Sequence, residues 1–122
     1  MKIKLGKSEL IHFVGIGGIG MSGLALIMNE LGFNVQGSDI SSNKNIERLK
    51  KNRINIFVGH KSKNVKKSTI VVVSSAIKRN NIELLIAKKR KIPIYKRGDM
   101  LAHVVSLMRN VVVAGSHGKT TT

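Results

Sequence analysis

The stretch Ile11-His-Phe-Val-Gly-Ile-Gly-Gly-Ile-Gly20 decides the fold, because it joins a short apolar run to a glycine-rich loop. Within it, Gly15, Gly17 and Gly20 form the pattern G-x-G-x-x-G. The pattern gains meaning here because it follows an expected strand and opens an expected helix that ends near Leu31. Gly15 permits a tight turn, Gly17 lets the backbone approach a pyrophosphate, and Gly20 lets the helix pack on the strand. Since helix N-termini favour anions, we predict that this unit binds the phosphate groups of a ligand.

Apolar runs alternate with helical stripes along the rest of the chain. The runs are typical of strands buried on both faces: Ile11–Val14, Asn34–Gly37, Ile54–Val58, Ile70–Val73, Ile92–Tyr95 and Val111–Ala114. The stripes predict helices around Leu24–Leu31, Ile46–Leu49, Ile82–Ile86 and Leu101–Met108. We expect Gly32 to end the first helix, Ser42 and Asp99 to be N-caps, and the lysine-rich segment 59–69 to be a surface loop or short helix. The order predicts a single α/β domain with a Rossmann-like, doubly wound, mainly parallel sheet and helices on both faces.

Charge and composition narrow the class of protein. The 122 residues carry 22 Lys+Arg against 6 Asp+Glu, a formal net charge of +16. Such a field attracts polyanions. However, the lysines are scattered and an aromatic content of 3% leaves few rings to stack on bases, so we expect a solvated basic surface and no nucleic-acid partner. The absence of cysteine excludes disulfides and thiolate metal sites. The apolar run Leu10–Met28 contains five glycines, which favours folded structure over a signal peptide or membrane span, so we expect a soluble, cytoplasmic protein.

Asp39 lies 19 residues after Gly20, at the end of the second expected strand. An acidic residue at this place typically binds ribose hydroxyls. Taken alone, the glycine loop and Asp39 favour NAD as the ligand, and an NAD-dependent oxidoreductase domain is therefore one hypothesis. A turn or cap role for Asp39 is the structural alternative.

A second phosphate motif lies at the end of the chain, where the expected strand Val111–Ala114 runs into Gly115-Ser-His-Gly-Lys-Thr120. In a P-loop, backbone N–H groups hold phosphates, the lysine meets the β- and γ-phosphates, and the hydroxyl holds Mg²⁺. Val113 stands where the longer P-loop pattern has glycine, so this is a shortened version. Because the chain stops at Thr122, the helix behind the loop is missing. We expect a piece of a larger enzyme whose last residues are disordered or misplaced and which has no ATPase activity by itself.

The two motifs together resemble the N-terminal domain of the Mur ligases across essentially the whole chain, and within them the branch that joins L-alanine to UDP-N-acetylmuramate. Positions 98 and 99 are Gly and Asp where the family more often has Ala and Glu, and Ser116 stands where Thr is common. The related murein peptide ligases are the nearest alternative, although their first loop is not usually G-I-G-G-I-G-M-S-G. The matching stretches are 12–23, 37–39, 59–60, 73–77, Arg97 with 100–102, and 115–122.

The resemblance implies a UDP-sugar-binding domain over residues 1–109 and the first strand and P-loop of a central ATP-binding domain over 110–122. It implies an ATP- and Mg²⁺-dependent ligase that converts the substrate carboxylate to an acyl phosphate, which the amine of L-alanine attacks. The residues implied for the UDP-sugar are Gly15, Gly17, Gly18, Ile19, Gly20, Ser38, Asp39, His60, Ser74, Ser75, Ala76 and Arg97. Those implied for ATP are Gly115, Ser116, His117, Gly118, Lys119, Thr120 and Thr121, with Lys119 and Thr120 catalytic and Thr120 on Mg²⁺.

For three of these residues, a purely structural role is the alternative. His60 is also compatible with a loop histidine that touches no ligand, and Ser74 and Ser75 with an ordinary turn at a strand end. We expect His12 to be a strand residue and His103 a helix-surface residue, and neither to be catalytic.

Overall fold

The protein is described by a computed structural model that covers the backbone of residues 3–116 and the side chains of residues 3–109. Five strands form one parallel sheet in the order β3-β2-β1-β4-β5. They are β1 (Leu10–Val14), β2 (Asn34–Asp39), β3 (Asn55–Val58), β4 (Ile70–Val73) and β5 (Ile94–Lys96). The helices are α1 (Ile19–Glu30), α2 (Lys44–Lys51), α3 (Ile82–Lys89) and α4 (Arg97–Ser116), with a short 3₁₀ helix η1 (Ser62–Val65). The α/β, doubly wound class is confirmed.

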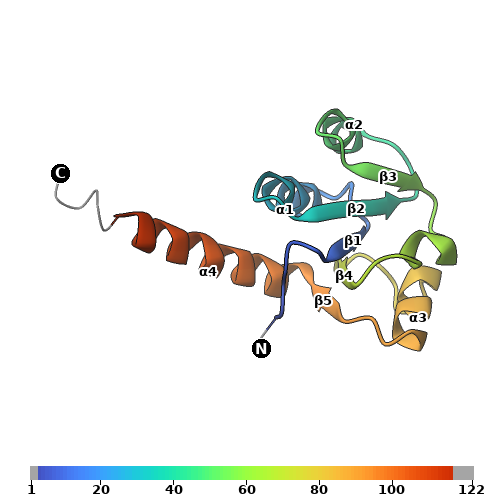
Figure 1. The fold of residues 1–122 in the computed structure, drawn as a ribbon. Helices are drawn as coiled ribbons and strands as arrows, with labels where there is room; N and C mark the ends of the chain where they lie inside the picture. The colour runs from blue at the N-terminus through green and yellow to red at the C-terminus, as the bar shows by residue number, and fades with distance from the viewer. Residues whose placement is uncertain (1–2, 117–122) are drawn as a thin grey trace.

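Helices cover both faces of the sheet (Figure 1). In the view of Figure 1, α1 and α2 lie on one side and α3 on the other, while α4 leaves β5 and extends beyond the sheet. The two-residue repeat of a strand sorts the core accordingly. Ile11 and Phe13 of β1 pack in the cluster with α1, α2 and the start of α4, whereas Val14 packs in the cluster with α3.

The strand order creates a switch point between β1 and β4. From β1 the chain first moves toward β2 and β3, and then returns to β4 and β5 on the opposite side. Loops that follow the carboxyl ends of β1 and β4 therefore diverge, and this is where open α/β sheets bind ligands. The glycine loop follows β1, and the serines at 74 and 75 follow β4.

The ends of the helices confirm one expected cap and correct two others. Leu31 is the C-cap of α1 and Gly32 follows with φ +95°, so the expected end of this helix is confirmed. Asn43, not Ser42, caps α2, because its side chain accepts a hydrogen bond of 2.9 Å from the Ile46 amide, the donor at the third helical position. Helix α4 already begins at Arg97, which leaves Asp99 in the first turn rather than at the cap.

The segment Val111–Ala114 is helical, which differs from the strand predicted there, because α4 continues without a break to Ser116. A parallel strand needs a neighbouring strand to receive its backbone hydrogen bonds, whereas a helix satisfies these groups within itself. None of the five strands within residues 3–116 pairs with this segment. The expected short helix in segment 59–69 is confirmed as η1.

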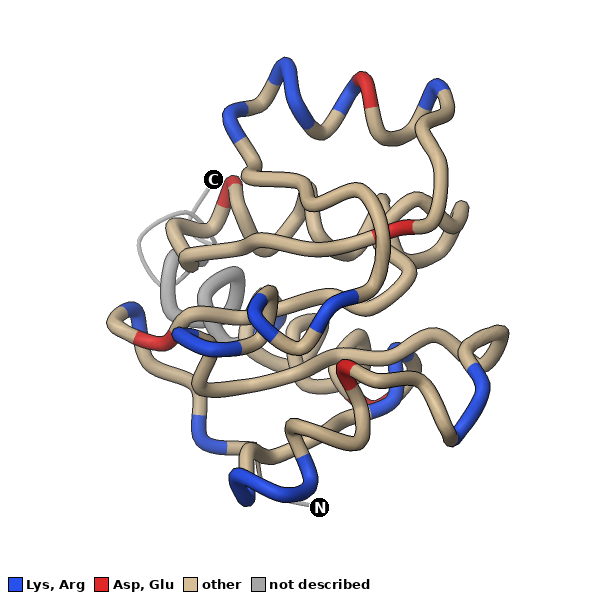
Figure 2. The backbone as a smooth tube through the Cα atoms, turned by 90° about the vertical axis from the view of Figure 1, so that its right-hand side faces the viewer, with Lys and Arg blue, Asp and Glu red and all other residues tan. Residues whose placement is uncertain are grey.

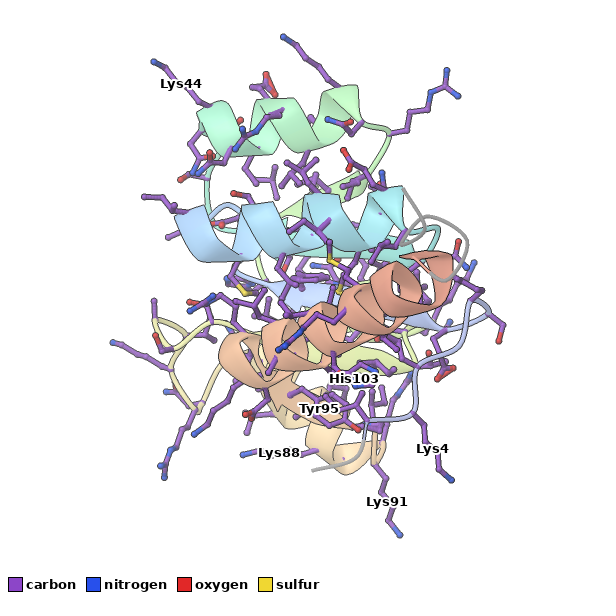
Figure 3. All side chains as sticks on the ribbon, turned by 90° about the vertical axis from the view of Figure 1, so that its left-hand side faces the viewer. Lys4, Lys44, Lys88, Lys91, Tyr95 and His103 are labelled. Carbon is purple, nitrogen blue, oxygen red and sulfur yellow. The ribbon has the colours of Figure 1, made fainter. Side chains whose placement is uncertain are left out.

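The positive charge is spread over the surface. Figure 2 shows Lys and Arg positions along α2 and in the loops, with few acidic positions among them. Lys4, Lys44, Lys88 and Lys91 point outward in different directions in Figure 3. Across residues 3–116, none of the helices has the length and apolar character needed to cross a bilayer.

Candidate nucleotide-binding site

The glycine loop is tied to the end of β2 by backbone hydrogen bonds. Gly15 has φ +83°, a conformation that L side chains rarely adopt. This turn points the amides of Gly15 and Ile16 at one acceptor, the carbonyl oxygen of Ser38, at 2.9 and 3.0 Å. The Gly18 amide closes the loop on the Gly15 oxygen at 3.2 Å. The first glycine therefore makes the tight turn that the sequence predicted.

The start of α1 is open to an anion. Gly18 is its N-cap and supplies no side-chain acceptor, and the first turn contains no acidic residue. Gly18, Ile19 and Gly20 are exposed, and the Ile19 side chain is 88% exposed. The first N–H groups of a helix have no partner inside the helix and carry a partial positive charge. The loop tip thus has the geometry of a phosphate site.

Asp39 holds the loop. Its Oδ2 atom accepts a hydrogen bond of 2.7 Å from the Gly17 amide, and its Oδ1 atom accepts one of 2.8 Å from the Ile40 amide. On the other side, the side-chain amides of Asn43 and Asn45 donate to the Gly17 oxygen at 3.3 and 3.0 Å. Each carboxylate oxygen of Asp39 keeps a second lone pair, which can accept from a ligand hydroxyl. Sequence reasoning missed the two asparagines, which precede and open α2.

A side chain added at either of two loop glycines would press against a neighbouring side chain. A Cβ on Gly17 would lie 2.7 Å from Asp39 Oδ2 and 3.1 Å from the Ile46 side chain. A Cβ on Gly20 would lie 3.0 Å from both Cδ and Nε of Arg97 and 3.2 Å from its Cζ. The structure therefore brings Arg97, from the junction of β5 and α4, directly against the glycine loop.

The turn after β4 borders the same region. The Ser74 hydroxyl accepts a hydrogen bond of 3.1 Å from the Ala76 amide, which forms a tight turn with Ser75 and Ala76 exposed. The Ile77 side chain lies 3.0 Å from where a Cβ on Gly15 would be. A groove of about 690 Å³ opens between this turn and the start of α4, and its polar lining includes Ser74, Ser75, Arg79, Lys88, Lys96, Arg97 and Asp99.

A buried polar cluster lies beneath the site on the α3 side of the sheet. Ser38 is fully buried, and its hydroxyl donates to Glu83 Oε1 at 2.6 Å. The structure thus places Ser38 below the surface of the site, with its side chain engaged inside the protein. His60 is 13% exposed, and its Nδ1 lies 3.0 Å from Ser38 Oγ and 3.5 Å from Glu83 Oε2. His12 is a fully buried residue of β1 whose Nε2 lies 2.7 Å from Glu83 Oε1.

Glu83 is ionised in this cluster. Burial by itself raises the pKa of a carboxyl group, but hydrogen bonds from His12, Ser38 and Asn64 outweigh it and lower the pKa of Glu83 from 4.5 to about 2. Sequence reasoning missed Glu83. The available signal was the row of polar residues at 12, 36 and 38, which the strand repeat places on one otherwise apolar face.

The residues expected to bind ATP are only partly described. Gly115 and Ser116 form the last residues of α4, while His117, Gly118, Lys119, Thr120 and Thr121 lie outside the described residues, as does the predicted magnesium ligand. His103 is half-buried on α4. In the part of the chain that the structure describes, no group of three or more His, Asp or Glu side chains can hold a metal ion.

The parallel sheet, its switch point and the uncapped start of α1 define a Rossmann-like α/β domain in which a glycine loop leads into an open helix N-terminus. The family described as Mur ligase family, catalytic domain, matches residues 10–109, and the chain belongs to this family.

Relatives of the chain are known in sequence and in structure. It is 70% identical, over all of its length, to the UDP-N-acetylmuramate–L-alanine ligase of Pelagibacter ubique, of which it spans 26%. A crystal structure of UDP-N-acetylmuramate-alanine ligase from Thermotoga maritima matches with a TM-score of 0.77 and 36% identity, covering 80% of this chain and 23% of that one. A UDP-N-acetylmuramate:L-alanyl-γ-D-glutamyl-meso-diaminopimelate ligase from Neisseria meningitidis matches at 0.73 and 26%, covering 78% and 30%. The chain thus spans about a quarter of the length of the relatives it matches.

Proposed function

We propose that this chain is the UDP-sugar-binding part of an ATP-dependent ligase that joins L-alanine to UDP-N-acetylmuramate. The observation that carries the proposal is the exposed, uncapped start of α1, with the Arg97 side chain packed on Gly20 beside it. A diphosphate carries two negative charges in a short span, and it suits a helix N-terminus flanked by a guanidinium group. The names of the most similar relatives supply the sugar and the amino acid.

The contacts of the site suggest a division of roles. The amides of Ile19 and Gly20 receive the diphosphate, and Arg97 neutralises its charge. Asp39, which already orients the loop, accepts from a ribose hydroxyl. His60 and the turn at Ser74, Ser75 and Ala76 border the nucleoside.

The reaction proposed for the whole enzyme needs activation of a carboxylate, because a free carboxylate is a poor electrophile. ATP transfers its γ-phosphoryl group to the carboxylate of the sugar's lactyl group and leaves as ADP. The amine of L-alanine then attacks the acyl phosphate, the amide bond forms and inorganic phosphate leaves. Phosphoryl transfer depends on positioning and on cations around the oxygens, and Lys119 and Thr120, with Mg²⁺, are the residues of this chain that we assign to that step.

We further propose that residues 1–109 form the UDP-sugar domain and 110–122 the beginning of a central ATP-binding domain that works in the cytoplasm. On this proposal the 122-residue chain has no ATPase activity.

Calorimetry tests the proposal against the two other classes. The 122-residue chain is titrated with UDP-N-acetylmuramate, with NAD and with a DNA duplex. We expect binding heat only in the titration with UDP-N-acetylmuramate. Binding of NAD without the UDP-sugar would establish an oxidoreductase-type site, and tight DNA binding that weakens steeply with salt would establish a nucleic-acid module.

A further inference from the structure

Glu83 occupies an unusual place for a charge. Within residues 3–109 it is the one acidic side chain with no exposure to solvent. A buried carboxylate is costly unless hydrogen bonds replace its hydration. An apolar side chain in the first turn of α3 would be enough to cover the sheet. The negative charge of Glu83 therefore needs another explanation.

Four donors converge on this carboxylate. Oε1 is 2.7 Å from His12 Nε2 and 2.6 Å from the Ser38 hydroxyl. Oε2 is 3.0 Å from the Lys61 amide and 2.8 Å from the side-chain amide of Asn64. Two of the four donors, Lys61 and Asn64, come from the segment that follows β3. Glu83 therefore ties the His60-containing loop to the sheet.

The hydrogens of the cluster can be assigned from its connectivity. The Gln36 side-chain amide has two hydrogens, and they reach His12 Nδ1 and the Asn64 oxygen, both at 2.9 Å. His12 Nδ1 is thus an acceptor. The hydrogen of the ring is on Nε2, which donates a hydrogen bond to the Glu83 carboxylate. Neutral His12 completes the network without a second charge.

The same reasoning fixes His60. The Ser38 hydroxyl has one hydrogen, which it donates to Glu83 at 2.6 Å. The 3.0 Å contact between Ser38 Oγ and His60 Nδ1 then requires that Nδ1 carry the proton. In the neutral ring, Nε2 consequently holds a lone pair and accepts.

That lone pair faces the surface. No side-chain nitrogen or oxygen buried within the described residues lacks a hydrogen-bond partner. His60 Nε2 has no partner among them, so it is accessible to solvent. The preceding residue, Gly59, donates its amide to the Asp39 oxygen at 2.7 Å, which places His60 beside the carboxyl end of β2.

We propose that Glu83 is a positioning residue of the nucleotide site. Through Ser38 it holds His60 as the Nδ1–H tautomer and presents Nε2 as an acceptor to a donor group of the bound nucleoside, a ribose hydroxyl or a base N–H. This rests on the function proposed above for its ligand, but the tautomer itself is a property of the free protein.

Two-bond ¹H–¹⁵N correlation spectra of the imidazole rings test the tautomer directly, at a pH of about 8 where an ordinary histidine is neutral. We expect the Nδ1–H pattern for His60 in the free chain. Ser38→Ala removes the group that links His60 to Glu83, and the His60 signals should shift toward a mixture of tautomers. Ser68→Ala is the matched control, because Ser68 is also a buried serine, whose hydroxyl donates to the Val65 oxygen at 2.7 Å outside this cluster.

Titration with UDP then tests the role. We expect affinity to fall about tenfold in Ser38→Ala, the value of one lost hydrogen bond to a fixed partner, and to stay unchanged in Ser68→Ala. Glu83→Gln leaves two of the four donors without an acceptor and should have the same effect on the His60 tautomer where it folds.

The outcomes separate cleanly. An Nε2–H pattern in the free wild-type chain would overturn the proposal, and so would an altered tautomer in Ser38→Ala with unchanged UDP affinity. If the chain binds no UDP while His60 has the Nδ1–H pattern, the proposed function and the ligand contact fail and the internal assignment holds.

Discussion

The backbone amide of Gly17 donates a 2.7 Å hydrogen bond to Oδ2 of Asp39, which joins the glycine loop after β1 to the last residue of β2. The bond spans 22 positions of the sequence. It makes Asp39 part of the loop's own architecture as well as a candidate ribose ligand. A substitution at Asp39 would therefore change both the loop structure and the contact with ribose. Substitutions at the glycines test the loop separately.

Gly17→Ala tests the close approach at the loop. The added Cβ would lie 2.7 Å from Asp39 Oδ2 and 3.1 Å from the Ile46 side chain, so the loop has to shift. We expect affinity for UDP to fall by about tenfold or more, because a displaced loop loses directed N–H contacts. Calorimetry measures this.

Gly23→Ala is the matched control for that substitution. Gly23 lies inside α1 with nothing within 4 Å of an added Cβ. Alanine there should stabilise the fold by about 0.5–1 kcal/mol and leave UDP affinity unchanged. Equal losses of affinity in both variants would contradict the assignment of the loop.

Gly20→Ala separates binding from stability. Its Cβ meets the Arg97 side chain at 3.0 Å, and a flexible side chain can move aside. We expect no loss of folding free energy, since alanine suits a helix better than glycine, but weaker binding of UDP because the guanidinium leaves its place. The same affinity in Gly20→Ala and wild type would show that Arg97 does not contact the diphosphate.

Gly37→Ala tests the packing of β1 and β2 beneath the loop. The new Cβ would lie 2.6 Å from Ile16 Cβ and 2.8 Å from the Phe13 carbonyl oxygen, and backbone atoms cannot move aside. Overpacking of this kind costs about 1–3 kcal/mol and occasionally more, measurable by urea unfolding. Gly6→Ala, with nothing within 4 Å, should unfold like wild type, and a Gly37→Ala protein of normal stability would show that the packing is looser than described.

Acid should remove the contribution of the buried Glu83 carboxylate to the free energy of unfolding. The pKa of Glu83 is lowered from 4.5 to about 2 by its hydrogen bonds in the folded chain. Between these values the unfolded chain therefore binds more protons, so the contribution of Glu83 is fully present above pH 4.5 and lost as the pH falls toward 2. This loss is at most about 3 kcal/mol, because the full shift also includes the attraction of a charged His12, which the neutral ring assigned above does not supply.

Urea unfolding at a series of pH values measures this loss. Glu83→Gln should start less stable and lose less stability on acidification, while exposed Glu47→Gln should follow wild type. Parallel declines in wild type and Glu83→Gln would mean that another group dominates the acid response.

Much of the fold is predictable from local signals. The apolar runs located all five strands to within two residues at each end, and Gly32 marked the end of α1. These features depend on hydrophobic period and glycine conformation, which neighbouring residues determine. The strand predicted at Val111–Ala114 failed for the opposite reason, because strand formation depends on a partner elsewhere.

The geometry of the candidate site was predictable in its exposed part, whereas its ligand stays a prediction. The glycine pattern located Gly15, Gly17 and Gly20, and the structure places Arg97 beside them. The buried support was not predictable, since the contact between His12 and Glu83 spans 71 positions. Asn43 capping α2 likewise could not be told from Ser42 by sequence preference alone.

The proposal that the Gly15–Gly20 loop binds the diphosphate of a UDP-sugar is tested most directly by backbone amide shifts during titration with UDP-N-acetylmuramate. We expect the largest shifts at Ile19 and Gly20, with smaller ones at Asp39 and His60. A second hollow on the surface of α2 is the alternative binding place, and the amide signals of its residues should not shift. Its lining residues are Ser42, Asn43, Lys44, Glu47, Arg48 and Lys51. Dominant shifts at α2, with none at Ile19 and Gly20, would contradict the account.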